Sequence, residues 1–425
     1  MRFLFATWDG GGNVPPTLAL AGRLVARGHA VRILAPRSLR AAVEGHGCGH
    51  ALYRDVWDGI PAAAGTAPTG RLRACAILPE LARAAPALGF ARDVLRELER
   101  EPADALVCDF MLAGGIAAGE RAGVPTAALM HTIYCIPRRG SAPFGPGFAT
   151  ARGPAGRLRD AAFSALGQWG SGPMLSDLNG ARRRIGLAPV SSAADQLARA
   201  SRVLVLTTTA FDTPPPSLPS NVRYVGPQLE PSPSGAPPAL SHLPDGPLIL
   251  VSFSSRLPGT TVVQRALDAL SQLPVNGVLT LGPVLDPQRL RLPANVTARR
   301  FIPHAALLPY ARLAITHAGL GTVMAALAHG VPLLCIPLCK DQFENAARVS
   351  AAGAGRSINR RTRPTELRGA ILELLGNARY AAAARRQATA IAADEGRAVD
   401  ELEALASDRS IRSLSMQRPK SMDSR

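Results

Sequence analysis

The sequence predicts an α/β protein with two domains, each built around a parallel sheet. Short apolar runs alternate with longer helical segments along most of the 425 residues, which is the pattern of sheets covered by helices. A chain of this length also exceeds what one ordinary core can bury. A proline-dense segment, 211–247, separates two such runs, and we expect it to connect the domains because proline disrupts regular elements.

The first half opens with a strand, a glycine-rich loop from Asp9 to Pro16, and a helix that ends at Gly28. Apolar runs and Gly or Pro turn signals place the other elements. The segment 137–172 is rich in Gly, Ala, Pro and Arg, and we expect it to form loops and short helices over the site. The predicted strands are 2–7, 30–35, 105–108, 126–130 and, as the last of this domain, 203–207; the predicted helices are 17–27 and 112–122.

The second half continues the alternation of strands and helices. Its final predicted helix is long enough to pack back across the first domain. The tail that follows is polar and aperiodic, so we expect it to be disordered. The predicted strands are 248–253, 277–281 and 296–301, and the predicted helices are 261–270, 365–375 and 380–405.

The stretch 313–346 is the most informative part of the chain. From Leu313 to Cys339 it contains no Lys, Arg, Asp or Glu, and its length and apolarity alone would indicate a membrane span. Glycines, prolines and histidines divide it instead into a strand at 313–316, a glycine loop, a helix at 322–328, a turn and a strand at 333–336. A glycine-rich helix entry leaves backbone N–H groups at the positive end of the helix dipole, so we expect a diphosphate to bind there.

Composition restricts the class of protein. Hydrophobic residues are 47% and aromatic residues 4%, which is typical of a soluble α/β protein with a core of Ala, Val and Leu. The net charge of +17 is carried by scattered arginines and forms no basic run with aromatics, so we expect no nucleic-acid partner, whereas anionic small molecules fit the charge. The first residues, MRFLFATW, resemble a strand and not a signal peptide. The six dispersed cysteines indicate reduced, mostly buried thiols in the cytoplasm.

Four polar residues follow predicted strands of the first domain. Asp9 and Asn13 lie in the loop after the first strand, and Asp109 and His131 directly follow two later strands. Ligands of open parallel sheets bind outside the carboxyl ends of the strands, so all four are expected at one binding edge. The loop lacks the GxGxxG spacing and no acidic residue closes the next strand, which argues against a nicotinamide or flavin cofactor.

Two motifs resemble a known family. THAGLGTVMAALAHGVPLLCIPLCKDQFENAARV is similar to the donor-binding signature of GT-B glycosyltransferases of the UDP-glycosyltransferase superfamily, family 1. GNVPPTLALAGRLVARGHAV resembles the acceptor-side motif of its bacterial antibiotic and macrolide branch, and the similarity extends to about Leu405. It implies a GT-B fold, with two Rossmann-like doubly wound domains facing across a cleft. The implied parts are an acceptor-binding domain at 1–210, the linker 211–247, a nucleotide-sugar domain at 248–380, a helix at 381–405 that packs back on the first domain, and a disordered tail at 406–425.

The resemblance assigns the phosphate and sugar contacts of the donor. His317 and the amides from Gly319 through Gly321 to Thr322 would hold the diphosphate, with the Thr322 hydroxyl on a phosphate. Asp341 and Gln342 match the pair that binds hydroxyls of the donor sugar, although the same two residues also fit the acidic start of a helix.

Further donor contacts are implied after two strands of the second domain. Ser254 and Ser255 resemble the serine that contacts phosphate. Phe301, Ile302 and His304 occupy the base-recognition motif, in which the Phe301 ring would stack on the base and Ile302 would offer its backbone. A buried core position for Phe301 is the competing interpretation.

The sequence departs from the family twice. Ala325 stands where relatives carry a glutamate that binds the ribose hydroxyls, which favours a deoxyribose donor such as a dTDP-sugar over UDP-glucose, or reflects a weaker hold on the donor. Asn13 stands where relatives carry the catalytic histidine, and an amide cannot accept a proton. Asp109 matches the aspartate that orients this histidine and is the first candidate for a base, with Asp9 and His131 as reserves. An acidic or electron-rich acceptor would lessen the need for a strong base.

We therefore expect an inverting, metal-independent glycosyltransferase of the hexosyltransferase type. It would move a sugar or deoxysugar from a dTDP- or UDP-sugar to a small apolar natural-product aglycone, without a cofactor; the sequence contains no DxD motif. The alternatives are a catalytically weakened homologue that binds nucleotide sugar or aglycone as an auxiliary protein, and a nucleotide-sugar epimerase. We expect a cytoplasmic monomer or homodimer without stable membrane insertion.

Overall fold

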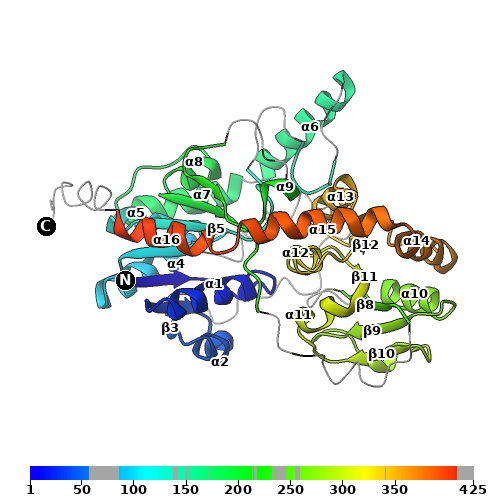
Figure 1. Ribbon diagram of the computed structural model, residues 1–425. Helices are drawn as coiled ribbons and strands as arrows, with labels where there is room; N and C mark the ends of the chain where they lie inside the picture. Colours follow the sequence, from blue (N-terminus) through cyan, green and yellow to red (C-terminus); the bar gives the residue numbers. More distant parts are fainter. Residues whose placement is uncertain are drawn as a thin grey trace, which may run out of the picture.

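Two parallel sheets organise the chain in the computed structural model (Figure 1). The statements below concern only the residues that the structure describes. These residues are 1–56, 86–136, 142–148, 151, 153–170, 172–212, 214, 218–231, 235, 246–253, 259–339 and 341–408.

The first sheet has seven described strands in the order β3-β2-β1-β4-β5-β6-β7, all parallel to their neighbours. β4 and β5 are buried at every position, because helices cover both faces of the sheet. The strands are β1 (Arg2–Ala6), β2 (Ala30–Ala35), β3 (Gly49–Leu52), β4 (Ala105–Asp109), β5 (Thr126–Met130), β6 (Arg202–Val205) and β7 (Val222–Tyr224).

The second sheet has six described strands in the order β10-β9-β8-β11-β12-β13, again all parallel. The predicted fold class of two parallel-sheet units is thus confirmed. The strands are β8 (Leu248–Ser252), β9 (Asn276–Thr280), β10 (Val296–Arg299), β11 (Ala311–Thr316), β12 (Leu333–Cys335) and β13 (Gly355–Ser357).

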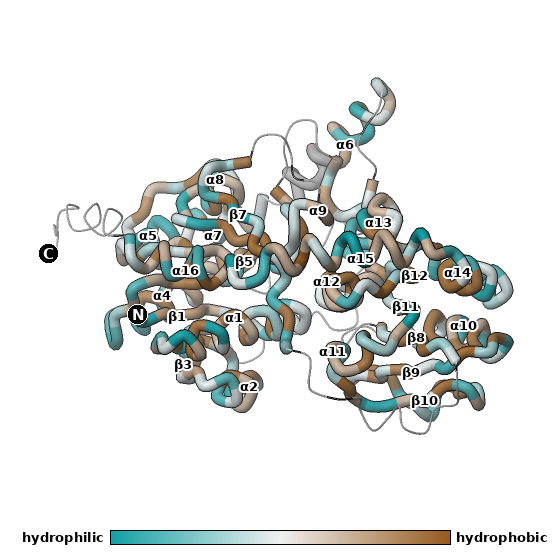
Figure 2. The backbone as a smooth tube through the Cα atoms, viewed as in Figure 1, coloured by the Kyte–Doolittle hydropathy of each residue, from teal (hydrophilic) through white to brown (hydrophobic). Residues whose placement is uncertain are grey.

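Helices cover both sheets, and teal and brown residues alternate along α14, as expected for a helix with one face on a core (Figure 2). None of the described helices combines the length and apolarity that crossing a membrane requires. The helices of the first half are α1 (Val14–Ala26), α2 (Arg40–Gly45), α4 (Ala87–Arg100), α5 (Ala113–Ala122), α6 (Pro154–Gly170), α7 (Gly172–Arg184), α8 (Ala193–Ala198) and α9 (Thr209–Asp212). Those of the second half are α10 (Thr260–Leu270), α11 (His304–Leu307), α12 (Leu320–Ala328), α13 (Gln342–Ala351), α14 (Pro364–Gly376), α15 (Ala378–Ala393) and α16 (Arg397–Ser407).

The stretch that could have passed for a membrane span folds as predicted into β11, α12 and β12. β11 pairs with β12 and β8, and α12 packs against the same sheet. The described cysteines are free and buried, as expected, while Cys75 lies outside the described residues.

The prediction that 203–207 is the last strand of the first sheet is wrong. β7 extends that sheet by one strand and lies inside 211–247, where we expected no regular element. β7 can form there because it has only three residues, contains no proline and pairs at the edge of the sheet. α9 also falls within this segment at its start.

Three helix predictions also need correction. The single helix predicted at 380–405 is two helices, α15 and α16, because Gly396 adopts a left-handed conformation with φ of 84° between them. α16 nevertheless packs into the core of the first sheet, and α15 packs into that of the second, as Figure 1 shows in red. α1 begins three residues earlier than 17–27, because Pro15 and Pro16 fit its first turn. α6 is longer than the short helices expected at 137–172.

Candidate active site

The first-sheet candidates meet at the carboxyl ends of β1, β4 and β5. Asp109 ends β4, His131 directly follows β5, and Asn13 caps the start of α1. The Oδ2 atom of Asp109 lies 2.9 Å from Asn13 Nδ2 and 3.5 Å from His131 Nε2. The sequence prediction that these three side chains share one edge is therefore confirmed. Asp9 lies partly buried in the loop between β1 and Asn13.

The Asp109 carboxylate is enclosed by hydrogen-bond donors. Its Oδ2 also accepts from Trp8 Nε1 at 3.1 Å, and its Oδ1 accepts from the Met111 amide at 2.9 Å. Asp109 is 2% exposed. Sequence reasoning missed Trp8 and Met111, since neither residue type marks a catalytic motif. A carboxylate with both oxygens engaged in this way is suited to holding neighbours in place.

The Asn13 amide is bound by its own loop. Its Nδ2 donates to the Trp8 carbonyl at 2.8 Å and to Thr7 Oγ1 at 3.3 Å, in addition to Asp109. Its Oδ1 is buried without a hydrogen-bond partner. A Cβ at Gly10 would lie 2.6 Å from this oxygen, so the loop requires glycine there.

The His131 ring lies between Asp109 and α1. Its side chain is 6% exposed, and Nε2 lies 3.4 Å from Thr17 Oγ1. Nδ1 is buried without a hydrogen-bond partner. Burial lowers the pKa of His131, and the charge of Asp109 partly opposes this shift. The imidazole is therefore neutral near pH 7.

The loop in which we expected the diphosphate to bind joins β11 to α12. Gly319 is the N-cap residue of α12. No side chain forms a capping hydrogen bond with this helix, and its first turn contains no acidic residue. The first-turn amides of a helix have no carbonyl partner within it, so Leu320 to Thr322 offer N–H groups to an anion. A Cβ at Gly319 would lie 2.7 Å from His317 Nε2, which explains why glycine follows the histidine so closely. Ala318 between them has φ of 65°, which is strained for a residue with a Cβ.

His317 lies close to the end of β8 and to a second histidine. Its ring centroid is 6.4 Å from that of Phe253. Burial lowers the pKa of His317 to about 4, and nearby His304 contributes in the same direction. His317 is therefore neutral at pH 7 and has a single N–H, and a backbone hydrogen bond with Ser252 opposes part of the pKa shift, so the Ser252 carbonyl and a phosphate oxygen would compete for this N–H.

α13 begins at the Asp341-Gln342 pair. Asp341 is its cap residue, so the alternative interpretation as a helix start is confirmed as local structure. The Gln342 oxygen accepts from the amides of Leu338 and Cys339 at 2.9 and 3.0 Å, which ties the preceding turn to the helix. Gln342 is 5% exposed, so in this structure its side chain shapes the turn.

Asn345, one turn into α13, connects the two donor motifs. Its Nδ2 donates to the carbonyl of strained Ala318 and to Asp341 Oδ2, both at 3.0 Å. Asn345 is completely buried. Sequence reasoning missed this residue, although it lies within the quoted signature.

The segment that we expected to recognise the base follows β10. Phe301 is 77% exposed, so the interpretation of Phe301 as a core residue is wrong: the ring stands free for stacking. Ile302 packs partly buried beside the core that contains α12. His304 begins α11, and burial lowers its pKa to about 4. Ser254 and Ser255 lie outside the described residues.

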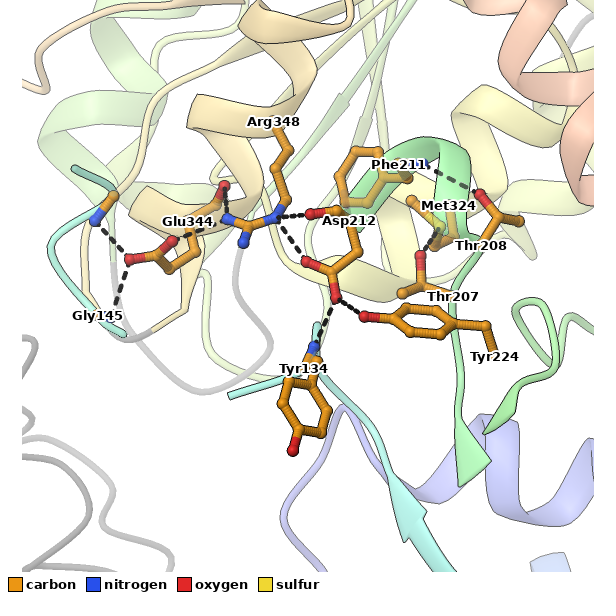
Figure 3. A network of polar contacts seen from close by, with 11 residues as sticks. Tyr134, Gly145, Thr207, Thr208, Phe211, Asp212, Tyr224, Met324, Glu344 and Arg348 are labelled. Carbon is orange, nitrogen blue, oxygen red and sulfur yellow. Dashed lines mark hydrogen bonds and ion pairs between the residues drawn. The ribbon is translucent and has the colours of Figure 1, made fainter. Parts of the chain in front are cut away.

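A polar network connects α13 to the first half of the chain (Figure 3). Glu344 Oε1 accepts from the amides of Gly145 and Gly147 at 2.9 and 2.7 Å. Arg348 donates to Glu344 Oε2 at 2.8 Å and to Asp212 Oδ1 at 2.9 Å. Both carboxylates are buried. The helix that starts at Asp341 is thus fixed to the loop 142–148.

The same network continues towards the first-sheet candidates. Asp212 Oδ2 accepts from the Tyr134 amide at 2.7 Å and from the Tyr224 hydroxyl at 2.6 Å. Tyr134 lies three residues after His131. The network therefore reaches from α13 to the segment that follows His131, through contacts between residues far apart in sequence.

Within the described residues, no group of three or more His, Cys, Asp or Glu side chains is arranged to hold a metal ion.

Comparisons with known proteins find relatives of this chain in sequence and in fold. The family model described as Erythromycin biosynthesis protein CIII-like, C-terminal domain, matches residues 264–404. The chain is 34% identical over 404 residues to 4'-demethylrebeccamycin synthase of Lentzea aerocolonigenes, and the match covers 91% of this chain and 94% of that protein.

Solved structures share the whole architecture. The glycotransferase of kitacinnamycin superposes with a TM-score of 0.75 at 23% identity, covering 95% of this chain and 98% of the other. Glycosyltransferase VinC in complex with DTDP gives a TM-score of 0.70 at 19% identity, covering 96% and 99%.

Proposed function

Because the chain belongs to the antibiotic-type branch of the GT-B glycosyltransferases, we propose that it transfers a sugar from a nucleoside diphosphate to a small apolar natural-product aglycone. Membership of this family makes the protein a glycosyltransferase. The proposal concerns the donor, the acceptor class and the course of the reaction. The observation that carries it is the uncapped start of α12 beside His317, an anion site at the carboxyl edge of the second sheet.

The diphosphate is proposed to lie on the α12 entry. The N–H groups of Leu320 to Thr322, the Thr322 hydroxyl and the His317 ring would face its oxygens. As the bond from the sugar to the diphosphate breaks, negative charge develops on the leaving group, and these fixed dipoles stabilise it. This arrangement supplies the charge stabilisation that a metal ion gives in other enzymes, which supports a metal-independent reaction.

The nucleotide is proposed to be dTDP. Ala325 offers no carboxylate to a ribose diol, which suits a deoxyribose. The exposed Phe301 ring supports stacking on the base. VinC, which shares this fold, has been solved in complex with DTDP. UDP is the alternative and is distinguished by competition for the same site.

The donor sugar is proposed to contact Asp341, whose carboxylate is held in place by Asn345. Gln342 would act mainly by holding the turn at 338–339. An acceptor bound near Asn13 and Asp109 would attack the anomeric carbon from the side opposite the diphosphate. This direct displacement inverts the configuration at that carbon.

One observation favours a second function. Asn13 replaces the usual histidine, and Asp109 has donors on both oxygens, so neither side chain can take the acceptor's proton as placed. If no other group serves as base, the protein would bind nucleotide sugar or aglycone as an auxiliary protein.

The test is nucleotide release that depends on an acceptor. Purified protein is incubated with dTDP- or UDP-hexoses and a panel of phenolic and indolic aglycones, and free dTDP or UDP is measured. We expect release with at least one pair. Binding of dTDP measured by calorimetry, together with no release for any pair, would favour the auxiliary protein. Equal competition by UDP and dTDP would contradict the proposed preference for the deoxyribose nucleotide.

A further inference from the structure

Two of the side chains that contact Asp109 each carry a buried polar atom without a hydrogen-bond partner. The two atoms are Asn13 Oδ1 and His131 Nδ1, and both belong to side chains that contact Asp109 Oδ2. Buried polar atoms are almost always paired, so an unpaired one beside a reaction site needs an explanation. Of these two atoms, only the imidazole nitrogen can take up a proton near neutral pH.

This inference rests on the proposed function. We propose that His131 is the general base of the transfer, with Nδ1 as the atom that accepts the acceptor's proton and Asp109 as the carboxylate that orients the ring. The pair restores the histidine and aspartate of the family, with the histidine supplied from the end of β5 instead of the start of α1. Asp109 keeps its role, while the histidine comes from another strand.

The surrounding hydrogen bonds assign the tautomer. Thr17 Oγ1 uses its hydrogen to donate to the Asn13 carbonyl at 2.8 Å, so this oxygen can only accept from His131. Asp109 as a carboxylate also accepts only. Both neighbours lie on the Nε2 side, so the ring hydrogen resides on Nε2. Nδ1 is therefore the nitrogen with the free lone pair.

The electrostatic setting suits a base. Burial keeps the ring neutral at pH 7 by lowering the pKa of His131, so the lone pair is available. The charged group that acts on the ring is Asp109; the contacts from α1, Asn13 and Thr17, are neutral. When Nδ1 takes the proton, the resulting imidazolium faces the Asp109 carboxylate and is stabilised by it.

The proposed step moves one proton and exchanges one bond at the anomeric carbon of the sugar. The acceptor's O–H or N–H gives its proton to Nδ1 while its heavy atom forms the bond to the anomeric carbon. The bond from that carbon to the diphosphate breaks, and the diphosphate leaves with the electron pair. Asp109 stays ionised throughout, which agrees with its engaged oxygens.

Replacement of the ring tests the proposal. His131→Gln and His131→Asn are measured for kcat/KM over pH 5 to 9 and for dTDP binding by calorimetry. We expect kcat/KM to fall by roughly 10²–10⁴-fold. We also expect dTDP affinity within about threefold of wild type, and loss of the acid limb that wild type shows on the acidic side of the ordinary histidine range, because burial lowers the pKa of His131. If one variant fails to bind dTDP, the other is used.

His50→Gln is the matched control, since His50 Nδ1 is also buried without a partner but lies on β3. We expect its kcat/KM to stay within about twofold of wild type. The inference would be overturned if both His131 variants kept a kcat/KM within threefold of wild type. It would also be overturned if Asp9→Asn lost the acid limb of the pH profile while both His131 variants kept it. Wild type that releases no nucleotide would instead count against the proposed function itself.

Discussion

At the residue scale, the donor loop shows why small side chains surround His317. Gly319 approaches the ring so closely that an added Cβ would lie 2.7 Å from Nε2. Ala318 is held at a φ of 65° next to it, so the loop is conformationally constrained on both sides. The glycine is thus needed for the position of the histidine.

Gly319→Ala should displace the His317 ring and weaken donor binding. We expect the dissociation constant of dTDP to rise about tenfold or more, equivalent to roughly 1.4 kcal/mol. Calorimetric titration measures this change. Gly369→Ala, on α14, is the control because a Cβ there meets nothing within 4 Å. Unchanged dTDP affinity in Gly319→Ala would contradict the close approach that the structure shows.

Sequence reasoning succeeded with residues whose role follows from the backbone. The rule that ligands bind at the carboxyl ends of parallel strands was enough to predict that Asn13, Asp109 and His131 lie at one edge. The sequence could not decide between base candidates, because that choice depends on which atoms are already hydrogen-bonded. The sequence also could not predict that Phe301 is exposed, since an aromatic residue after a strand can belong to a core or to a binding surface.

At the element scale, α13 joins the loop before α12 to its own first residues, the two places where we propose that the phosphate and the sugar of the donor bind. Asn345 reaches from this helix to Ala318 in the α12 entry and to Asp341 at its own start. The bond to the Ala318 carbonyl stabilises the strained loop conformation. α13 therefore fixes the geometry of a loop that precedes it by more than twenty residues in sequence.

Asn345→Asp should break both contacts, because a carboxylate cannot donate and would face Asp341 with a like charge. We expect the KM for the donor sugar to rise by about tenfold or more, given a cost of about 1–3 kcal/mol for an unpaired buried group. Asn359→Asp is the control, since the Asn359 oxygen accepts from the Arg361 amide and an aspartate keeps this bond. Steady-state kinetics at varied concentrations of the sugar donor measure this change in KM. A donor KM that rises equally in both variants would speak against a specific role for Asn345.

Elements with strong local signals were predictable, and those set by partners were not. β11, α12 and β12 follow from apolar runs cut by glycine and proline. β7 was missed because three residues between prolines carry no pattern and become a strand only by pairing with β6. The break between α15 and α16 was missed because a single glycine is often tolerated inside a helix.

At the scale of the whole molecule, the network through Glu344, Arg348 and Asp212 links the two halves of the chain. It holds the loop 142–148 and α9 against α13 (Figure 3). Arg348 is the cation between two buried carboxylates. Glu344 and Arg348 are four residues apart on one helix and could be paired from sequence, but the contacts of Glu344 with Gly145 and of Arg348 with Asp212 span 199 and 136 residues and could not.

Arg348→Met should leave both carboxylates buried without their cation. We expect the free energy of unfolding to fall by about 3–5 kcal/mol, the usual cost of removing one partner of a buried pair. Chemical denaturation followed by fluorescence measures it. Arg386→Met, an exposed position on α15, serves as the control with an expected change within about 0.5 kcal/mol. A denaturation midpoint equal to wild type would show that the network does not hold the halves together.

The central claim is that the protein transfers a sugar from a nucleoside diphosphate by direct displacement. The measurement that tests it most directly is the anomeric configuration of the product, determined by proton NMR after incubation with an α-configured dTDP-hexose and an aglycone from the panel. The account predicts a β-linked glycoside together with one equivalent of dTDP. An α-linked glycoside, or bound dTDP-hexose that is never consumed with any aglycone, would contradict it.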